Sequence, residues 1–116
     1  MPVSRTSAQK NVLCTAYLAN VAKVSLHYDD PGPSGTANEN AGGSPAYARK
    51  APPSGTVSPV NGVGSFQVIF DVAAGGAAKY ACLWDAAGNL LDGGAVTPQP
   101  FGSQGTYALT VQYQQN

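Results

Sequence analysis

The sequence predicts a mainly β, single-domain antiparallel β-sandwich or barrel with a short N-terminal helix. Short segments in which apolar residues alternate with polar ones recur over residues 22–114, and Gly- or Pro-rich turns separate them about every ten residues. A helical pattern precedes these segments, over residues 6–20. The 116 residues suffice for one core and leave too little chain for a second, so residues 1–116 are expected to form one domain.

Residues 6–20 carry both the start and the period of a helix. Thr6 is followed three residues later by Gln9, which is the pattern of a capping box. Asn20 is expected to end the helix in the left-handed conformation. The stripe at helical spacing that is expected to pack against the core consists of Val12, Leu13, Ala16 and Tyr17.

The apolar period changes to two over residues 22–28, which predicts a half-buried strand. Its expected exposed face is polar and holds Lys23, Ser25 and His27, and the expected buried face holds Ala22, Val24, Leu26 and Tyr28. Residues 29–44 are rich in Gly, Ser, Asn and Pro, so we expect an exposed loop that is long enough to contact a partner.

Six or seven strands are expected in all. After residues 22–28 they are predicted at residues 46–50, 55–60, 65–72, 79–85, 90–97 and 106–113. Residues 65–72 show the clearest alternation. Residues 79–85 are apolar on both faces, which predicts a central strand or one covered by a neighbouring subunit. Aromatic side chains usually fill a small β core, so we expect Phe66, Phe70 and Trp84 to be buried.

The content of ionised residues is low. Asp, Glu, Lys and Arg make up 10% of the chain, against roughly 25% in ordinary soluble domains. The formal net charge is zero, which favours self-association, although a neutral, Gly-rich monomer is the alternative. The six cations are scattered, which argues against a nucleic-acid partner, and no segment reaches the ~20 apolar residues of a membrane span.

No catalytic residue, cofactor or metal site is predicted. His27 is the single histidine, and Ser25 lies two residues before it on the same strand face. This pair could serve as base and nucleophile of a hydrolase, but the strand lacks the strained elbow that such chemistry uses. We therefore interpret His27 as an exposed histidine on the polar face.

Two further sets of residues have a chemical and a structural interpretation. The carboxylates and amides of residues 29–39 could bind calcium, but they lack the regular spacing of a calcium loop, so turn formation is favoured. Cys14 and Cys82 lack the spacing of a metal site, and whether they form a disulfide stays open.

Several short motifs occur in an order that resembles a family of small tailed-bacteriophage virion proteins. They are Val-Ser-Leu-His-Tyr-Asp-Asp-Pro-Gly at 24–32, Gly-Gly-Ser-Pro-Ala-Tyr-Ala-Arg at 42–49, Leu-Trp-Asp-Ala-Ala-Gly at 83–88 and Leu-Asp-Gly-Gly-Ala at 91–95. Ser-Pro-Ala at 44–46 is an insertion relative to the family pattern. Members are described as tail-fibre-like, minor tail or minor capsid proteins, so the resemblance implies an oligomeric β module of the virion and brings no catalytic residues.

These observations lead to the hypothesis of a non-enzymatic capsid decoration or minor capsid protein, assembled in the host cytoplasm. It would be a homotrimer that binds the major capsid protein or other virion proteins on the outer capsid surface. The alternative is a tail-fibre or minor tail protein that binds a host surface receptor. The residues expected at the interface are Tyr47, Arg49, Phe101 and Tyr113, because interfaces are enriched in aromatic residues and Arg.

Overall fold

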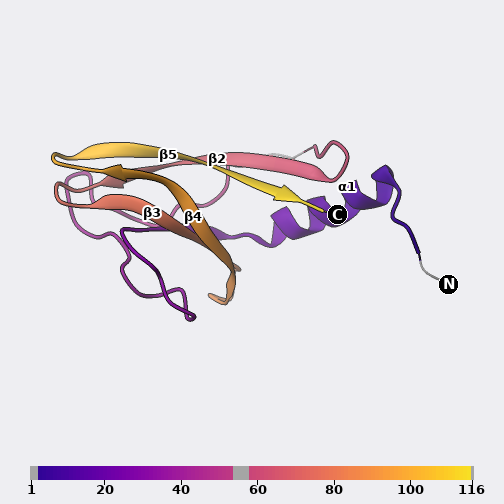
Figure 1. The fold of residues 1–116 in the computed structure, drawn as a ribbon, viewed down its shortest axis with the longest axis horizontal. Helices are drawn as coiled ribbons and strands as arrows, with labels where there is room; N and C mark the ends of the chain where they lie inside the picture. The colour runs from indigo at the N-terminus through magenta and orange to yellow at the C-terminus, as the bar shows by residue number, and fades with distance from the viewer. Residues whose placement is uncertain (1–2, 54–57, 116) are drawn as a thin grey trace.

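The computed structural model describes residues 3–53 and 58–115. In these ranges the chain forms one helix followed by five strands in two antiparallel sheets (Figure 1), which confirms the mainly β fold. The six or seven strands expected from the sequence were therefore too many for this part of the chain. The elements are α1 (Ser7–Asn20), β1 (Lys23–His27), β2 (Val63–Val72), β3 (Ala77–Trp84), β4 (Leu90–Pro100) and β5 (Gly105–Gln114).

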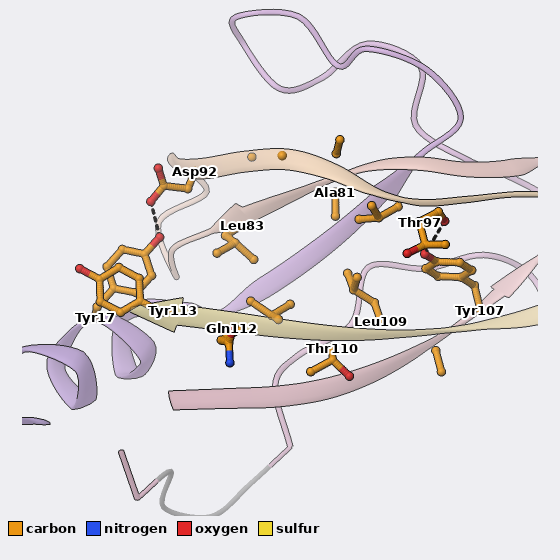
Figure 2. A pocket seen from close by; sticks show the side chains of 16 residues that line it. Tyr17, Ala81, Leu83, Asp92, Thr97, Tyr107, Leu109, Thr110, Gln112 and Tyr113 are labelled. Carbon is orange, nitrogen blue, oxygen red and sulfur yellow. Dashed lines mark hydrogen bonds between the residues drawn. The ribbon is translucent and has the colours of Figure 1, made fainter. Parts of the chain in front are cut away.

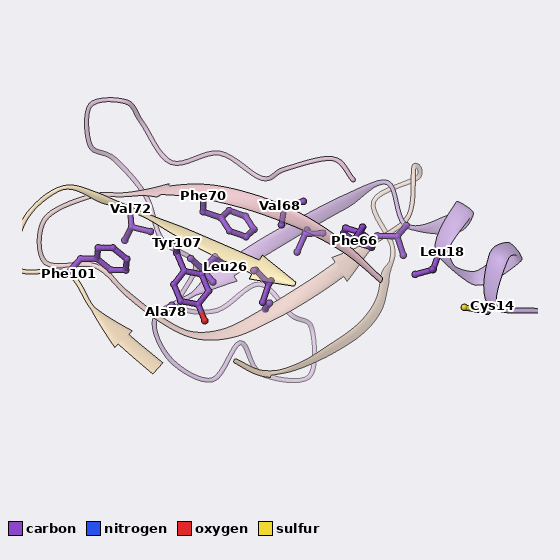
Figure 3. Packing of buried hydrophobic residues seen from close by; sticks show 14 residues of the cluster. Cys14, Leu18, Leu26, Phe66, Val68, Phe70, Val72, Ala78, Phe101 and Tyr107 are labelled. Atoms are coloured by element: carbon purple, nitrogen blue, oxygen red, sulfur yellow. The ribbon is translucent and has the colours of Figure 1, made fainter. Parts of the chain in front are cut away.

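One sheet has the strand order β1-β3-β4 and the other pairs β2 with β5. β3 is thus a central strand, as its two apolar faces predicted. The main core lies between the sheets (Figure 3), where Phe70, Val72 and Leu26 are fully buried. Alternate residues of β2 point into this core from Phe66 to Val72, which confirms the predicted period of this strand.

The helix starts as predicted but packs with a different face. The Thr6 hydroxyl accepts a hydrogen bond from the Gln9 N–H at 3.1 Å. The buried side chains are Cys14 and Leu18, whereas Val12 is 60% exposed. Of the predicted stripe, Ala16 is also exposed, Leu13 is half-buried and Tyr17 packs against the core, so the stripe was only partly right. The reason is that α1 lies at one end of the sheets (Figure 1), so that they cover only one narrow side of it.

The helix ends at Asn20 as predicted, but the left-handed conformation expected there was wrong. Asn20 is the last helical residue, and the cap is Val21 in an extended conformation with φ −78°. The Val21 N–H donates to the carbonyl of Leu18 at 3.2 Å. The chain therefore enters β1 directly, without a left-handed residue.

β1 is buried on both faces, which corrects the prediction of a half-buried strand. Ser25 and His27 are 0% exposed, although they were assigned to a polar surface. The cause is the segment of residues 28–50, called the covering segment below. It lies over the outer face of β1 and β3, and its Pro31, Gly35 and Asn40 are buried, so this loop is less exposed than expected.

Two of the predicted strands do not form as strands. Residues 46–50 contribute only a single bridge, from Lys50 to Val24. The expected strand at 55–60 has a single bridge, from Val60 to Val63, and residues 54–57 lie outside the described residues. Alternation in such short segments did not distinguish strands from irregular chain.

The covering segment also supplies hydrogen-bond partners to the outer edge of β1. The Val24 N–H donates to the Lys50 carbonyl at 2.7 Å, and directly after β1 the Tyr28 N–H donates to the Asn38 carbonyl at 2.9 Å. Between them, the Leu26 N–H donates to the Tyr47 hydroxyl at 3.0 Å. The amides of β1 that face away from β3 are thus satisfied within the chain, partly by a side chain in place of a strand.

The buried Asn40 joins the covering segment to two strands. Its backbone N–H and its side-chain amide both donate to the Leu26 carbonyl, at 3.1 and 3.2 Å. The same side-chain amide donates to the Ala77 carbonyl at 2.8 Å and accepts from the Ala77 N–H at 3.3 Å. Asn40 therefore holds this segment on the sheet in a fixed register.

We predict that Tyr47→Phe destabilises the fold, because the Leu26 N–H would lose its partner. An unsatisfied buried donor costs about 1–3 kcal/mol. The free energy of unfolding in urea should fall by that amount. Tyr28→Phe is the matched control, since the Tyr28 side chain is 46% exposed and its change should stay within about 0.5 kcal/mol. Equal losses in both variants would contradict this role of Tyr47.

Candidate functional site

The two sheets leave a groove between β4, at the edge of one sheet, and β5, at the edge of the other. The groove has a volume of about 790 Å³. Figure 2 shows Leu83 and Ala81 from β3 and Leu109 from β5 directed into it. The small residues Gly93, Gly94 and Ala95 line it along β4. An apolar floor between two strand edges is a suitable contact for an extended polypeptide segment.

Tyrosine side chains bridge the groove at both ends (Figure 2). At one end the ring of Tyr17, from α1, stacks on that of Tyr113 with 3.9 Å between centroids and an interplanar angle of 10°. The Tyr17 hydroxyl donates a hydrogen bond to the Asp92 carboxylate, which links α1 to β4. At the other end the Tyr107 hydroxyl donates to the Thr97 carbonyl at 2.7 Å. The open part of the groove therefore has fixed limits.

The Tyr17 hydroxyl stays protonated in this arrangement. Burial raises its pKa first, and the hydrogen bond to Asp92 and the negative charge of that carboxylate raise it further. It thus remains a hydrogen-bond donor at neutral pH and keeps α1 attached to β4.

A second polar arrangement lies beneath the covering segment. His27 Nδ1 is 2.7 Å from the Ala37 carbonyl, and because a carbonyl can only accept, Nδ1 donates this hydrogen bond. His27 Nε2 and the Ser25 hydroxyl form a hydrogen bond at 2.8 Å, and this hydroxyl accepts another from Trp84 Nε1 at 2.8 Å.

This chain of hydrogen bonds corrects the interpretation of His27 as an exposed residue. The Ser25 and His27 side chains have the spacing of a nucleophile and a base, yet both are 0% exposed and fully engaged with structural partners. The arrangement stabilises the layer between β3 and the covering segment. The absence of enzymatic activity stays a prediction.

Two of the four predicted interface residues meet around Glu39. Arg49 Nε and Nη2 each donate to one Glu39 carboxylate oxygen at 3.0 Å, and its guanidinium lies 4.3 Å from the centroid of the Trp84 ring. The Tyr47 hydroxyl donates to the same carboxylate at 2.6 Å, and the Tyr47 ring stacks near Phe70. The side chains of Tyr47 and Arg49 therefore already have partners within their own chain.

The other two predicted interface residues lie apart from this cluster. Phe101 is only 7% exposed and packs in the core, so it offers little surface to a partner. Tyr113 lines the groove between β4 and β5. Of the four residues, Tyr113 thus lies in the candidate site, and the interface role of the set stays a prediction.

The sequence interpretation missed Tyr17, Asp92 and Glu39 as organising residues. Tyr17 was assigned to the core and Glu39 to a loop, because nothing in a local pattern shows that residues 17 and 92 lie side by side. One feature of the sequence does point to the groove. β5 holds no charged residue over its whole length, which is unusual for a strand at a sheet edge.

The two cysteines are free thiols, so a disulfide between them is not formed. Cys14 lies on α1 and Cys82 on β3, and both are buried. Burial raises the pKa of both thiols. Within residues 3–53 and 58–115, no helix has the length and apolar character that a membrane span requires.

Comparisons with protein-family models, with curated proteins and with solved structures find no match to this chain. The resemblance to phage virion proteins therefore stays a prediction from the sequence motifs.

We predict that the contribution of Glu39 to stability is lost in acid. Burial raises the pKa of Glu39, but the hydrogen bonds from Arg49 and Tyr47 and the charge of Arg49 outweigh it and hold the pKa below its ordinary value. The ionised form thus stabilises the folded state above about pH 4.3, the ordinary pKa of Glu, and this stabilisation disappears as the pH falls through the lowered pKa.

The measurement is the free energy of unfolding of wild type and Glu39→Gln between neutral and acid pH. The difference between the two proteins should be largest near neutral pH and should shrink in acid. Asp85 also has a lowered pKa, from the backbone N–H of Asn89 first, and gives both proteins a shared pH dependence. A difference that stays constant with pH would contradict the assignment.

Proposed function

We propose that this chain is a structural protein of a bacteriophage virion, most specifically a capsid decoration or minor capsid protein. In this role it binds the major capsid protein or other virion proteins at the outer capsid surface and reinforces contacts between capsomers. The observation that carries the proposal is the groove between β4 and β5, which leaves the edge of β5 and an apolar floor open to another polypeptide.

Two further observations support the proposal. The motif order over residues 24–95 resembles virion proteins of tailed phages. The low content of ionised residues and the zero net charge favour a protein that spends its time in an assembly. Many copies on one lattice add their contacts, so that each contact can be weak while the shell gains strength from their number.

A tail-fibre or minor tail protein that binds a host surface receptor is the second candidate. The observation in its favour is the elongated shape, with principal extents of 54 × 28 × 26 Å and α1 at one end of the sheets (Figure 1). The motifs occur in tail proteins as well as in capsid proteins, so the location on the particle separates the two candidates.

We predict that gold-labelled antibodies against this chain decorate the capsid shell of purified particles. Mass spectrometry of the same particles should find the chain in many copies per virion. Labels at the tail alone would replace the capsid assignment with the tail assignment. Particles that lack the chain altogether would contradict both.

A groove-filling variant tests the site itself. The position of a Cβ on Gly94 is open, with no atom within 4 Å, and Gly94 lines the groove. We predict that Gly94→Trp lowers incorporation into particles about tenfold, the effect of ~1.4 kcal/mol. Gly102→Trp is the matched control, because Gly102 is equally open but does not line the groove. Equal incorporation of both variants would show that the groove is not the contact.

A further inference from the structure

The free edge of β5 presents a regular row of unpaired backbone groups. The Gln115 N–H donates to the Gly62 carbonyl at 2.8 Å, and the register continues from that pair along β2 and β5. Antiparallel pairs alternate in the direction of their backbone groups, so the odd-numbered residues of β5 bond to β2. The residues whose N–H and C=O groups point to the free edge are Thr106, Ala108, Thr110, Gln112 and Gln114.

The chain protects its other described strand edges, each in a different way. The covering segment satisfies the outer edge of β1. The free edge of β4 contains Pro98 and Pro100, which have no N–H to donate, and its Thr97 carbonyl is occupied by Tyr107. β2 carries Asp71, which pairs with Lys50 at 3.9 Å.

None of these protections applies to β5. It has ten residues from Gly105 to Gln114, with no charge and no proline among them. Natural proteins normally interrupt such an edge with a charge, a proline or a bulge, because an open edge pairs with other strands. The lack of charged residues and prolines in β5 therefore indicates that its free edge pairs with another strand.

We propose that β5 pairs antiparallel with β5 of a second copy across a twofold axis, forming a four-stranded sheet β2-β5-β5-β2. This inference deepens the proposed function, since it rests on the groove being a protein contact and names the polypeptide that covers it. The register that uses the row most fully places the axis at Thr110, so that Thr106 of one copy faces Gln114 of the other. The two apolar faces then lie on the same side of the joined sheet.

We assign the free edge of β5 to a second copy of the chain because this edge is complementary to itself. In this register Thr110 faces its own counterpart, Ala108 faces Gln112, and Leu109 faces Val111 on the core side. Pairs of Thr side chains across strands are favourable, and no like charges are opposed. The groove beside β5 is covered by the second copy, which removes its partly exposed apolar floor from water.

The proposed pairing implies a dimer, whereas the sequence led to the expectation of a homotrimer. A strand edge that pairs with the same edge of another copy is an isologous contact, which is satisfied once two copies have joined. The dimer is thus the unit that would take its place on the particle.

Thr110→Lys is the direct test, measured by sedimentation and native mass of the purified full chain at several concentrations. The wild type should be a dimer. Thr110→Lys opposes two lysines at the axis and should weaken the dimer at least tenfold. Gln67→Lys is the matched control, because Gln67 is exposed on the same sheet face and is the cross-strand neighbour of Thr110 on β2, away from the free edge of β5.

A charge exchange keeps the test independent of folding. Thr110→Lys mixed with Thr110→Glu should restore a mixed dimer, which a misfolded variant cannot do, and circular dichroism of each variant checks the fold. A monomeric or trimeric wild type would overturn the proposal, as would equal effects of Thr110→Lys and Gln67→Lys. If the wild type is a monomer and antibodies against it still label the capsid shell, the pairing is wrong and the proposed function holds. If it is a dimer but absent from particles, the pairing holds and the proposed function is wrong.

Discussion

The constraint on which this structure depends is that every strand edge needs a partner for its backbone groups. A sheet of three strands and a sheet of two leave four edges, and a small chain has few residues to cover them. Here the covering segment is used on β1, where Val24 and Leu26 would otherwise expose their amides. The chain concentrates its side-chain hydrogen bonds at that edge and leaves β5 open.

The covering segment needs its own support, because it has almost no apolar residues to bury. Hydrogen bonds and an ion pair provide this support. The Glu39 carboxylate binds Arg49 and Tyr47, Asn40 binds Leu26 and Ala77, and among the described residues no buried side-chain polar atom lacks a partner. Gly35 has φ +73°, a conformation that favours glycine, and a Cβ there would come within 2.8 Å of the Leu90 side chain, so a larger residue would be strained and Leu90 would have to shift. The layer is therefore held by fit and hydrogen bonds more than by apolar area.

The sequence predicted those elements whose pattern depends on two neighbouring layers. β2 and β5 alternate along their whole length, and the capping residue Thr6 marks the start of α1. Prediction from the sequence failed where a segment distant along the chain changes the environment of a local pattern. His27 has the sequence context of a surface residue and is buried because residues 28–50 fold back over it. The predicted α1 stripe has the period of a core face, yet its Val12 and Ala16 lie exposed because the helix stands at the end of the sheets (Figure 1).

The candidate site was predictable only in part, for the same reason. Tyr113 was selected from its residue type and lies in the groove, whereas the stacking of Tyr17 on it joins residues that are far apart in the sequence. Strand order decides which two edges face each other, and alternation does not contain strand order. The sequence does show that residues 105–114 carry no charge. This feature indicates a contact only once the structure shows that β5 lies at a sheet edge.

Residue-resolved amide hydrogen exchange, at protein concentrations below and above that of self-association, separates strand edges that are satisfied within the chain from the open edge of β5. We expect slow exchange at Val24, Leu26 and Tyr28 at every concentration, because their partners lie within the chain. The even-numbered amides of β5, such as Thr110, should exchange rapidly in dilute solution and become protected on association. Rapid exchange at Leu26 in the folded protein, or protection at Thr110 that does not change with concentration, would contradict these expectations.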